Sequence, residues 1–494
     1  MRFPGRSTLR GLVRLCTRQA PATAAVVVAA TVLMGQYGGA DHWWEASSHE
    51  QLPVFATFGD NSGELMVYNT AGAVATEDHP FFADLGVNGR ACVTCHQPAN
   101  AMSLGTERLD ERWVQTSGRD PIFAGVDGSN CPSLPQKVKS SHSLLLQRGL
   151  FRIYLPWPAA GVKPDFTIEV VRDPTGCNTD PVYGLQSAHP TISVYRRPRM
   201  VGNLKYVLGS PDILHTASLA ADGRDQSLEL QAIDAATAHE QTRRPLTSDE
   251  IKKILDFESQ VFIAQTTDLK GGDLDEVDGP ETLGAWNLAR GKVGPGVVSD
   301  ARKSAVFFAA NDWKPSSRPI DGDREEFRES VLRGNAIFST RQFLIRDTAN
   351  LTAGEQTAQQ GTCSTCHSAR LTGSNADQRP MDVGTTNPAF TDGSLNVQGL
   401  PLFKITCRQG APAHPFLGRV IYTTDPGRAL ITGKCSDVGS IVAQQLRGLA
   451  ARAPYFANGS AARLEDVVNF YDQRYGLKLS AKDKQDLANF LSVL

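Results

Sequence analysis

A chain of 494 residues is long enough for two to four domains, each with a buried core. Its 50 basic and 52 acidic side chains leave a net charge of −2, and this near-neutral balance gives no field that would attract nucleic acid or a membrane surface. We therefore expect no nucleic-acid partner. The 44 glycines and 28 prolines fit a globular protein with many loops.

The first 40 residues have the layout of a secretory signal. Five arginines between Arg2 and Arg18 precede an apolar run at residues 22–35, and small residues follow at 38–40. We expect cleavage after Ala40 and a periplasmic location. The alternative is an uncleaved anchor, but the apolar run is shorter than the ~20 residues that cross a bilayer comfortably. No later segment is apolar enough, so the mature chain should have no membrane span.

A Cys-x-x-Cys-His pattern occurs twice, with Cys92, Cys95 and His96 in the first copy and Cys363, Cys366 and His367 in the second. Two thiols at this spacing can add to the two vinyl groups of one porphyrin, and the histidine then lies under the iron. A thioredoxin-type redox pair or half of a zinc site are the alternatives. Two copies, both with the histidine, behind a secretion-like leader predict two covalently bound c-type haems.

Between the two motifs the periodicity is uneven. We interpret residues 97–190 as an insertion that covers the first haem, with a helical start near 140–154 and a short strand at 166–171. Residues 225–245 are helical in part, and Thr247 with Glu250 caps an amphipathic helix that continues to 262. Residues 266–323 are rich in Gly, Asp and Pro and suggest a linker.

The C-terminal part has the order expected of a class I cytochrome c. A helix at 325–343 precedes the second haem motif, and helices at 463–471 and 480–494 follow it. The predicted fold is therefore mainly α, with two cytochrome c-like haem domains and long irregular insertions. The domains cover residues 41–323, which include the insertion and the linker, and 324–494.

Cysteine usage agrees with an exported protein. Of nine cysteines, one lies in the leader and four in the haem motifs, which leaves Cys131, Cys177, Cys407 and Cys435. Pairing by proximity gives disulfides Cys131–Cys177 and Cys407–Cys435, with free buried thiols as the alternative.

Two further segments carry a family resemblance. They are Ala221-Asp222-Gly223-Arg224 with Leu228-Glu229-Leu230-Gln231-Ala232, and Ala453-Pro454-Tyr455-Phe456 followed by Leu464-Glu465. With the two haem motifs in order, the chain resembles the bacterial di-haem cytochrome c peroxidases and their relative MauG, which matures a tryptophan-derived quinone. The resemblance covers roughly residues 75–95, 195–260 and 325–494.

The resemblance implies ligands for the second iron. MauG has a tyrosine, and the peroxidases a methionine, at the position of Tyr471, the sixth ligand of that haem. A phenolate donor favours ferric iron and a low potential. The alternatives are that Tyr471 is a core aromatic residue with a hydrogen-bonded hydroxyl, or that Met381 or His414 is the ligand.

The resemblance also implies a distal site over the first haem. The family's distal glutamine matches Gln231, and its acid–base glutamate falls near Glu240 and His239. With Arg224 of the preceding motif, these are our catalytic candidates, and the alternative is a solvated helix end.

Two departures from the family pattern concern electron exchange and metal binding. The family's tryptophan between the haems is Ala221 here, so Trp113, Trp157 or a closer approach of the haems would have to replace it. A calcium ion is compatible with the carbonyls of Arg452 and Pro454, but its asparagine ligand has only Asn203 as a loose match.

The arginines at 196, 197 and 199 form a small basic patch, which is either a solvated turn or a surface for an acidic partner.

The favoured function is a periplasmic di-haem oxidoreductase that reduces hydrogen peroxide. Electrons would come from a small redox protein or from an oxidisable protein substrate. The alternatives are an electron-transfer cytochrome with two six-coordinate irons, and a di-haem oxygenase.

Overall fold

The computed structural model describes residues 42–208, 218–276, 279–290, 313, 321–351, 358–368, 371–375, 380–391 and 393–494. The predicted leader, residues 1–40, lies outside them. The chain is 30% helical and 19% strand and contains several small sheets, so the prediction of a mainly α fold is wrong. Strands pair over long sequence distances, and such pairing is invisible to a local reading of periodicity.

The largest sheet combines strands from both ends of the first haem segment. It has the order β2-β3-β8-β9, with β2 at Phe55–Gly59, β3 at Gly63–Asn69, β8 at Val261–Asp268 and β9 at Gly272–Asp273. Helix α7, Ser248–Gln260, leads directly into β8 and begins at Thr247, whose hydroxyl and Glu250 form the predicted capping box. Strand β8, β9 and helix α8 (Ala285–Arg290) lie within or extend into the segment predicted as a linker.

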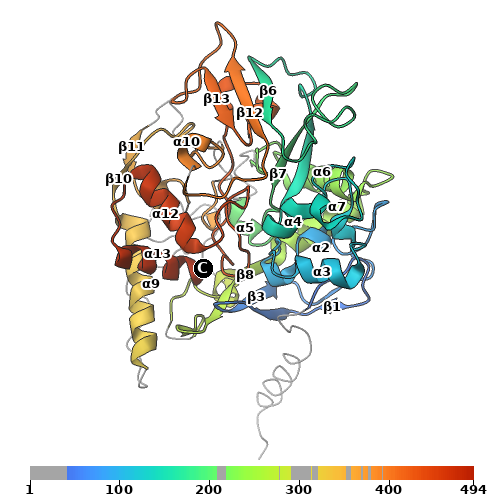
Figure 1. Cartoon of the computed structure of the whole chain (residues 1–494). Coiled ribbons are helices and arrows are strands. Elements are labelled where there is room, and N and C mark those ends of the chain that lie inside the picture. The colour runs from blue at the N-terminus through green and yellow to red at the C-terminus, as the bar shows by residue number, and fades with distance from the viewer. Residues whose placement is uncertain are drawn as a thin grey trace, which may run out of the picture.

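The predicted insertion is well structured and pairs with the C-terminal part of the chain. It contains α3 (Leu109–Thr116), α4 (Ser143–Arg148), β5 (Phe151–Pro156) and β6 (Phe166–Arg172). Strand β5 pairs with β7 (Thr191–Arg196), whereas β6 pairs with β12 (Leu402–Cys407), which in turn pairs with β13 (Val420–Thr423). The strand predicted at 166–171 is thus confirmed, and it joins segments from both sides of the predicted domain boundary (Figure 1).

Both predicted disulfides are confirmed. Cys131 bonds to Cys177, with their Cα atoms 5.1 Å apart, and Cys407 bonds to Cys435, with their Cα atoms 5.7 Å apart. Each bridge closes a segment near the three-stranded sheet.

The C-terminal helices lie on one side of the molecule (Figure 1). The helices predicted at 325–343, 463–471 and 480–494 are α9 (Gly322–Thr340), α12 (Leu464–Tyr475) and α13 (Ala481–Ser492). Helices α9 and α13 approach closely at Gly334, where a Cβ atom would lie 2.0 Å from the carbonyl oxygen of Asp486. They bury a shared apolar core that includes Phe327, Phe338 and Phe490.

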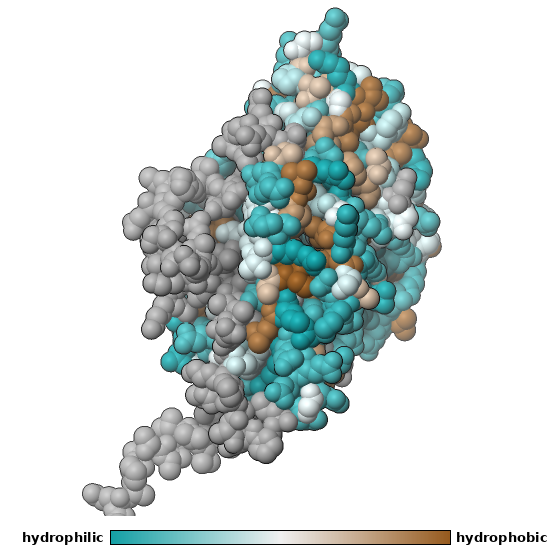
Figure 2. Space-filling model, turned by 90° about the vertical axis from the view of Figure 1, so that its left-hand side faces the viewer, coloured by the Kyte–Doolittle hydropathy of each residue, from teal (hydrophilic) through white to brown (hydrophobic). Residues whose placement is uncertain are grey.

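The remaining helices and strands are short. They are α2 (Cys92–Cys95), α5 (Leu204–Val207), α6 (Leu228–Ala235), α10 (Pro388–Thr391), α11 (Ala429–Thr432), β1 (Gln51–Leu52), β4 (Val74–Ala75), β10 (Phe343–Ile345) and β11 (Gln359–Gly361). Helix α6 continues as a π-helical turn, Ala236–Glu240. No helix in the described ranges is long and apolar enough to cross a bilayer. On the face shown in Figure 2, hydrophilic residues predominate and hydrophobic ones form small separate groups.

Candidate haem sites

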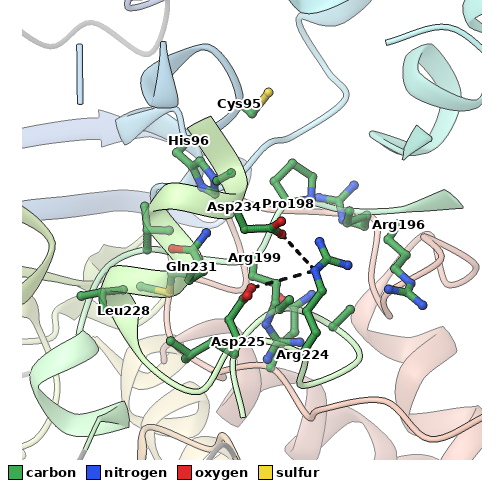
Figure 3. A pocket seen from close by; sticks show the side chains of 18 of the residues that line it. Cys95, His96, Arg196, Pro198, Arg199, Arg224, Asp225, Leu228, Gln231 and Asp234 are labelled. Carbon is green, nitrogen blue, oxygen red and sulfur yellow. Dashed lines mark hydrogen bonds and ion pairs between the residues drawn. The ribbon is translucent and has the colours of Figure 1, made fainter. Parts of the chain in front are cut away.

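Each Cys-x-x-Cys-His motif borders its own cavity. Cys95 and His96 line one cavity, shown in Figure 3, and Cys363, Cys366 and His367 line another. Each motif histidine therefore faces open space inside the protein, where a cofactor attached to the motif could lie.

The two motif histidines are oriented alike. The Nδ1–H of His96 donates to the carbonyl of Met102 (3.0 Å), and that of His367 donates to the carbonyl of Gly373 (2.9 Å). A proton on Nδ1 leaves the Nε2 lone pair available to a metal. Burial lowers the pKa of His96 to about 4 and also lowers the pKa of His367, so both rings are neutral, as a metal ligand must be.

The motif cysteines do not fit the two alternatives. Burial raises the pKa of the Cys95 thiol to about 12 and that of Cys366 to about 11, whereas a thioredoxin-type thiol has a lowered pKa. Within the described residues, no group of three or more His, Cys, Asp or Glu side chains could hold a metal ion such as zinc.

Helix α6 and the π-helical turn supply one wall of the first cavity. Gln231, Ala235 and His239 follow one another at intervals of four residues, and all three line the cavity. Ser227 caps α6 by accepting a hydrogen bond from the backbone N–H of Leu230. The structure therefore brings Gln231 and His239 together in the space that His96 borders (Figure 3 labels Gln231 and His96).

Arg224 lines the same cavity but is held by carboxylates. Its guanidinium bonds to Asp234 (3.0 Å) and Asp222 (3.1 Å) and lies 3.9 Å from Asp225. These ion pairs leave Arg224 a fixed cation in the cavity wall.

Glu240, the other acid–base candidate, points elsewhere. It is not among the residues that line the cavity, and its Oε1 accepts a hydrogen bond from the thiol of Cys92 (3.2 Å). Burial raises its pKa to about 8. Of the two candidates, only His239 faces the cavity, and its Nδ1 lies 2.6 Å from Oδ2 of Asp127.

Tyr471 lies across the second cavity from His367. The centroids of the two rings are 6.4 Å apart and their planes are nearly perpendicular. Within the described residues the Tyr471 hydroxyl has no hydrogen-bond partner, unlike that of Tyr475, which bonds to Thr348 (3.0 Å). Of the alternative ligands, Met381 lines this cavity and His414 does not, because its ring bonds to the Val438 carbonyl.

The predicted basic patch is largely buried, which overturns the interpretation of a solvated turn or docking surface. Arg196 is enclosed by Asp222 and Asp425, to which it is bonded at 2.5 and 2.7 Å. Arg197, together with Gln444 and Gln445, borders both cavities. The two cavities thus share a wall.

Two buried arginines in this wall region lack carboxylate partners within the described residues. Arg197 donates to the carbonyls of Arg148 (2.7 Å) and Arg452 (3.0 Å), and Arg452 donates to the carbonyl of Arg447 (3.1 Å). Burial lowers the pKa of Arg197 to about 9 and that of Arg452 to about 10. Buried cations are normally paired, so these arginines fit a cofactor that brings its own carboxylates, as haem does.

Sequence comparison finds a peroxidase among curated proteins. The chain is 30% identical over 214 residues to cytochrome-c peroxidase IdrP1 of Pseudomonas sp. (strain SCT), a match that spans 40% of this chain and 46% of that protein. Over that stretch the chain is similar to a cytochrome-c peroxidase. The resemblance predicted from the motifs is thereby confirmed, although the match covers less than half of this relative's length.

The other comparisons add little. No protein-family model matches. Two solved structures are similar at a TM-score of 0.28, which is too low to establish a shared fold. They are hydrazine synthase of Kuenenia stuttgartiensis (15% identity, 61% of this chain, 73% of that chain) and a MauG-like protein associated with microbial copper homeostasis (17%, 61% and 76%).

Neither candidate tryptophan lies in the wall that the two cavities share. Trp157 packs on Phe166, and Trp113 packs on Phe123, and neither borders a cavity. Ala221 lines the first cavity, and its carbonyl accepts a hydrogen bond from the backbone N–H of Val442. The shared wall supports the remaining alternative, a close approach of the two cofactors.

Two of the calcium candidates already have hydrogen-bond partners within the protein. The carbonyl of Arg452 accepts a hydrogen bond from the Arg197 guanidinium (3.0 Å). The Asn203 side chain donates to the carbonyl of Ile263 and accepts from its N–H, both at 2.8 Å.

Sequence reasoning missed Asp127 and the buried role of Arg197. Asp127 lies in the segment with the least legible pattern, and nothing near it in sequence marks it as a partner of His239, 112 residues away. The run of arginines is evident in the sequence. The carbonyls that accept hydrogen bonds from the buried Arg197 come from distant segments, so its burial could not be predicted.

Proposed function

We propose that the protein is an exported, periplasmic di-haem c-type oxidoreductase that reduces hydrogen peroxide with electrons from a protein donor. The match to a cytochrome-c peroxidase supports the peroxidase class. Two disulfides and two haem-attachment motifs support a location outside the cytoplasm, where both kinds of bond form.

The residues around the cavities fit two covalent haems. Cys92 and Cys95 would hold the first and Cys363 and Cys366 the second, with His96 and His367 as the proximal ligands through Nε2. Tyr471 would be the sixth ligand of the second haem. Bound haem supplies the redox-active iron at which peroxide is reduced.

The observation that carries the proposal is the polar pair Gln231 and His239, on α6 and its π-helical continuation, which lines the cavity of His96. Peroxide reduction requires a group that removes a proton from one oxygen and delivers it to the other, which leaves as water. The Nε2 atom of His239 can do both. Gln231, from the same helix face, can hold the peroxide by hydrogen bonds, because its amide both donates and accepts.

The first experiment measures cofactor content and coordination. The protein is produced in a host that matures c-type cytochromes, and its mass and pyridine haemochrome spectrum are recorded. We expect two haems per chain and a high-spin ferric component in the EPR spectrum. A mass equal to that of the amino acids alone would overturn the proposal.

The second experiment measures turnover of peroxide with a reduced small cytochrome as donor. We expect His239→Ala to lower kcat/KM by about a hundredfold or more, the usual contribution of a general acid–base group. Two low-spin haems in every redox state, without turnover, would instead indicate an electron-transfer cytochrome. Turnover of dioxygen but not of peroxide would indicate an oxygenase.

A further inference from the structure

We infer that Asp127, held by Arg90, positions His239 for proton transfer, so that the 97–190 segment supplies part of the reaction site. The inference rests on the proposed function for its use of peroxide. It extends that function by assigning a role to a segment that the family motifs do not cover.

The contact between the two side chains fixes the tautomer of the neutral imidazole. The Nδ1–H of His239 donates to Oδ2 of Asp127 at 2.6 Å, because a carboxylate can only accept. In the neutral ring Nε2 therefore carries the lone pair. Since His239 lines the cavity and Asp127 does not, the Nε2 edge is the one available to a molecule in the cavity.

Asp127 does not need His239 to balance its charge. Its side chain is 0% exposed and forms an ion pair with Arg90, whose guanidinium also donates to the carbonyls of Pro121 (2.7 Å) and Ile122 (2.8 Å). Although burial opposes it, the Arg90 cation, with the hydrogen bond from His239, lowers the pKa of Asp127. The buried carboxylate is thus a fixed anion beside Nδ1 of the imidazole. The side chain of His239 itself is 31% exposed.

The backbone that carries His239 is held from two sides. The carbonyl of His239 accepts a hydrogen bond from the side-chain amide of Asn88 (2.8 Å), and that of Ala238 accepts one from the hydroxyl of Tyr154 (3.3 Å). Both carbonyls lie in the π-helical turn, a feature that occurs often at functional sites. Asn88 precedes the first haem motif and Tyr154 lies on β5. Hydrogen bonds from these two segments therefore hold the backbone from which the His239 ring extends.

The arrangement predicts how a proton moves. When a weak acid enters the cavity, Nε2 accepts its proton and the imidazole becomes an imidazolium. The Asp127 carboxylate, 2.6 Å from Nδ1, stabilises that cation without taking its proton. Asp127 is therefore a positioning residue, whereas His239 makes the contact with the reactant.

The test uses cyanide as a probe that does not depend on turnover. Cyanide enters as HCN and must lose its proton on binding to the ferric holoprotein, so its uptake rate at pH 7, followed in the Soret band, reports the base. We expect Asp127→Asn and His239→Gln each to slow uptake at least tenfold. In the His239→Gln background, Asp127→Asn should cause no further slowing, because Asp127 acts only through His239.

Asp120 provides the matched control. It lies in the same segment and is buried, but its carboxylate pairs with Arg112 and with the backbone N–H of Ile122 and not with His239. Asp120→Asn should leave the cyanide rate within twofold of the wild type. If Asp127→Asn does not fold with its haems, Asp127→Glu, which keeps the charge but moves the oxygens, should also slow uptake.

The outcomes separate this inference from the proposed function. Equal rates in Asp127→Asn and Asp120→Asn, or effects of Asp127→Asn and His239→Gln that multiply, would overturn the positioning role. Faster uptake in His239→Gln would identify His239 as an iron ligand and would also overturn it. A dependence on both residues in a protein that does not turn over peroxide would retain the pair and reject the peroxidase.

Discussion

Tyr471 and Tyr475 lie one turn apart on α12, and their hydroxyls differ in environment. Both rings line the second cavity, but only the hydroxyl of Tyr475 bonds to a neighbour, Thr348. Burial raises the pKa of both phenols, so the phenolate form requires a positive partner. A bound metal ion is such a partner, because its charge lowers the pKa of a ligand. The hydroxyl of Tyr471 is the one left available for it.

Substitution of Tyr471 by Phe should therefore change the second haem. The variant loses the phenol oxygen but keeps the ring, and we expect a changed ferric absorption spectrum and a changed EPR signal for one haem of the two. Tyr475→Phe is the control: it should leave both spectra as they are and lower the free energy of unfolding by about 1 kcal/mol. If Tyr471→Phe has no spectral effect while Met381→Leu does, the ligand is Met381.

At the residue scale, the predictions depended on side chains whose chemistry requires them to be close together in the sequence. The two motif histidines and their cysteines were predicted as haem ligands and attachment points because attachment of a haem requires a fixed spacing within five residues. The choice between His239 and Glu240 could not be made, since it depends on a π-helical turn that directs one side chain to the cavity and the other to Cys92.

At the element scale, helix α7 combines a predictable start with an unpredicted buried carboxylate. The capping box of Thr247 and Glu250 was predicted because its signal lies within four residues. Glu258, two turns further, is buried among the apolar residues of the same helix. Burial raises its pKa from 4.5 to about 8.

The buried carboxyl of Glu258 should make stability fall as pH rises. Between pH 4.5 and 8 the folded state binds a proton that the unfolded state releases, so the free energy of unfolding decreases over that window. The shift corresponds to a loss on the order of 5 kcal/mol. We expect Glu258→Gln to flatten the dependence of the thermal midpoint on pH between 5 and 9.

Glu250→Gln on the same helix controls for the loss of a carboxyl. Its hydrogen bond with Arg244 lowers the pKa of Glu250 to about 2, so its contribution changes only below pH 4.5. This variant should keep the wild-type slope between pH 5 and 9. A wild-type slope in Glu258→Gln would mean that Glu258 is ionised in the folded state.

The strands are the elements that the sequence predicted least well. Strand β6 was found because its β-branched and aromatic residues form a run bounded by turn residues. The partners of β5 and β6 lie 35 or more residues away in the chain. Residues 140–154 therefore seemed helical throughout, whereas α4 ends at Arg148 and β5 begins at Phe151. Because this pairing was not predicted, the fold was predicted as mainly α although it contains both helices and sheets.

At the scale of the whole molecule, the two predicted haem domains are interleaved. Strand β6 from the first pairs with β12 from the second, and Arg196 bonds to Asp425 across the same boundary. Both cavities border Arg197. The contacts that would carry electrons between the cofactors therefore belong to the same packed region that holds the two parts together.

Removal of the Arg196 guanidinium should be costly. Arg196→Met leaves the buried Asp425 without its partner, and loss of one member of a buried pair costs about 3–5 kcal/mol. Lys404→Met is a matched control, because Lys404 pairs with Glu169 across the same boundary at the surface and should cost less than about 1 kcal/mol. Equal effects in urea unfolding would contradict a special role for the buried pair.

The predicted boundary at residue 323 can be tested by separating the two parts. In residues 324–494 alone, Phe403 and Ile405 would lose the apolar contacts that they share in one core with Phe166, Ile192 and Val194. We expect this fragment to lack a cooperative unfolding transition, and residues 41–494 to unfold in a single transition by both far-UV circular dichroism and Soret absorbance. Two separate transitions in the whole chain, with one reproduced by the fragment, would show instead that the haem domains fold independently and that the shared sheet adds little to their stability.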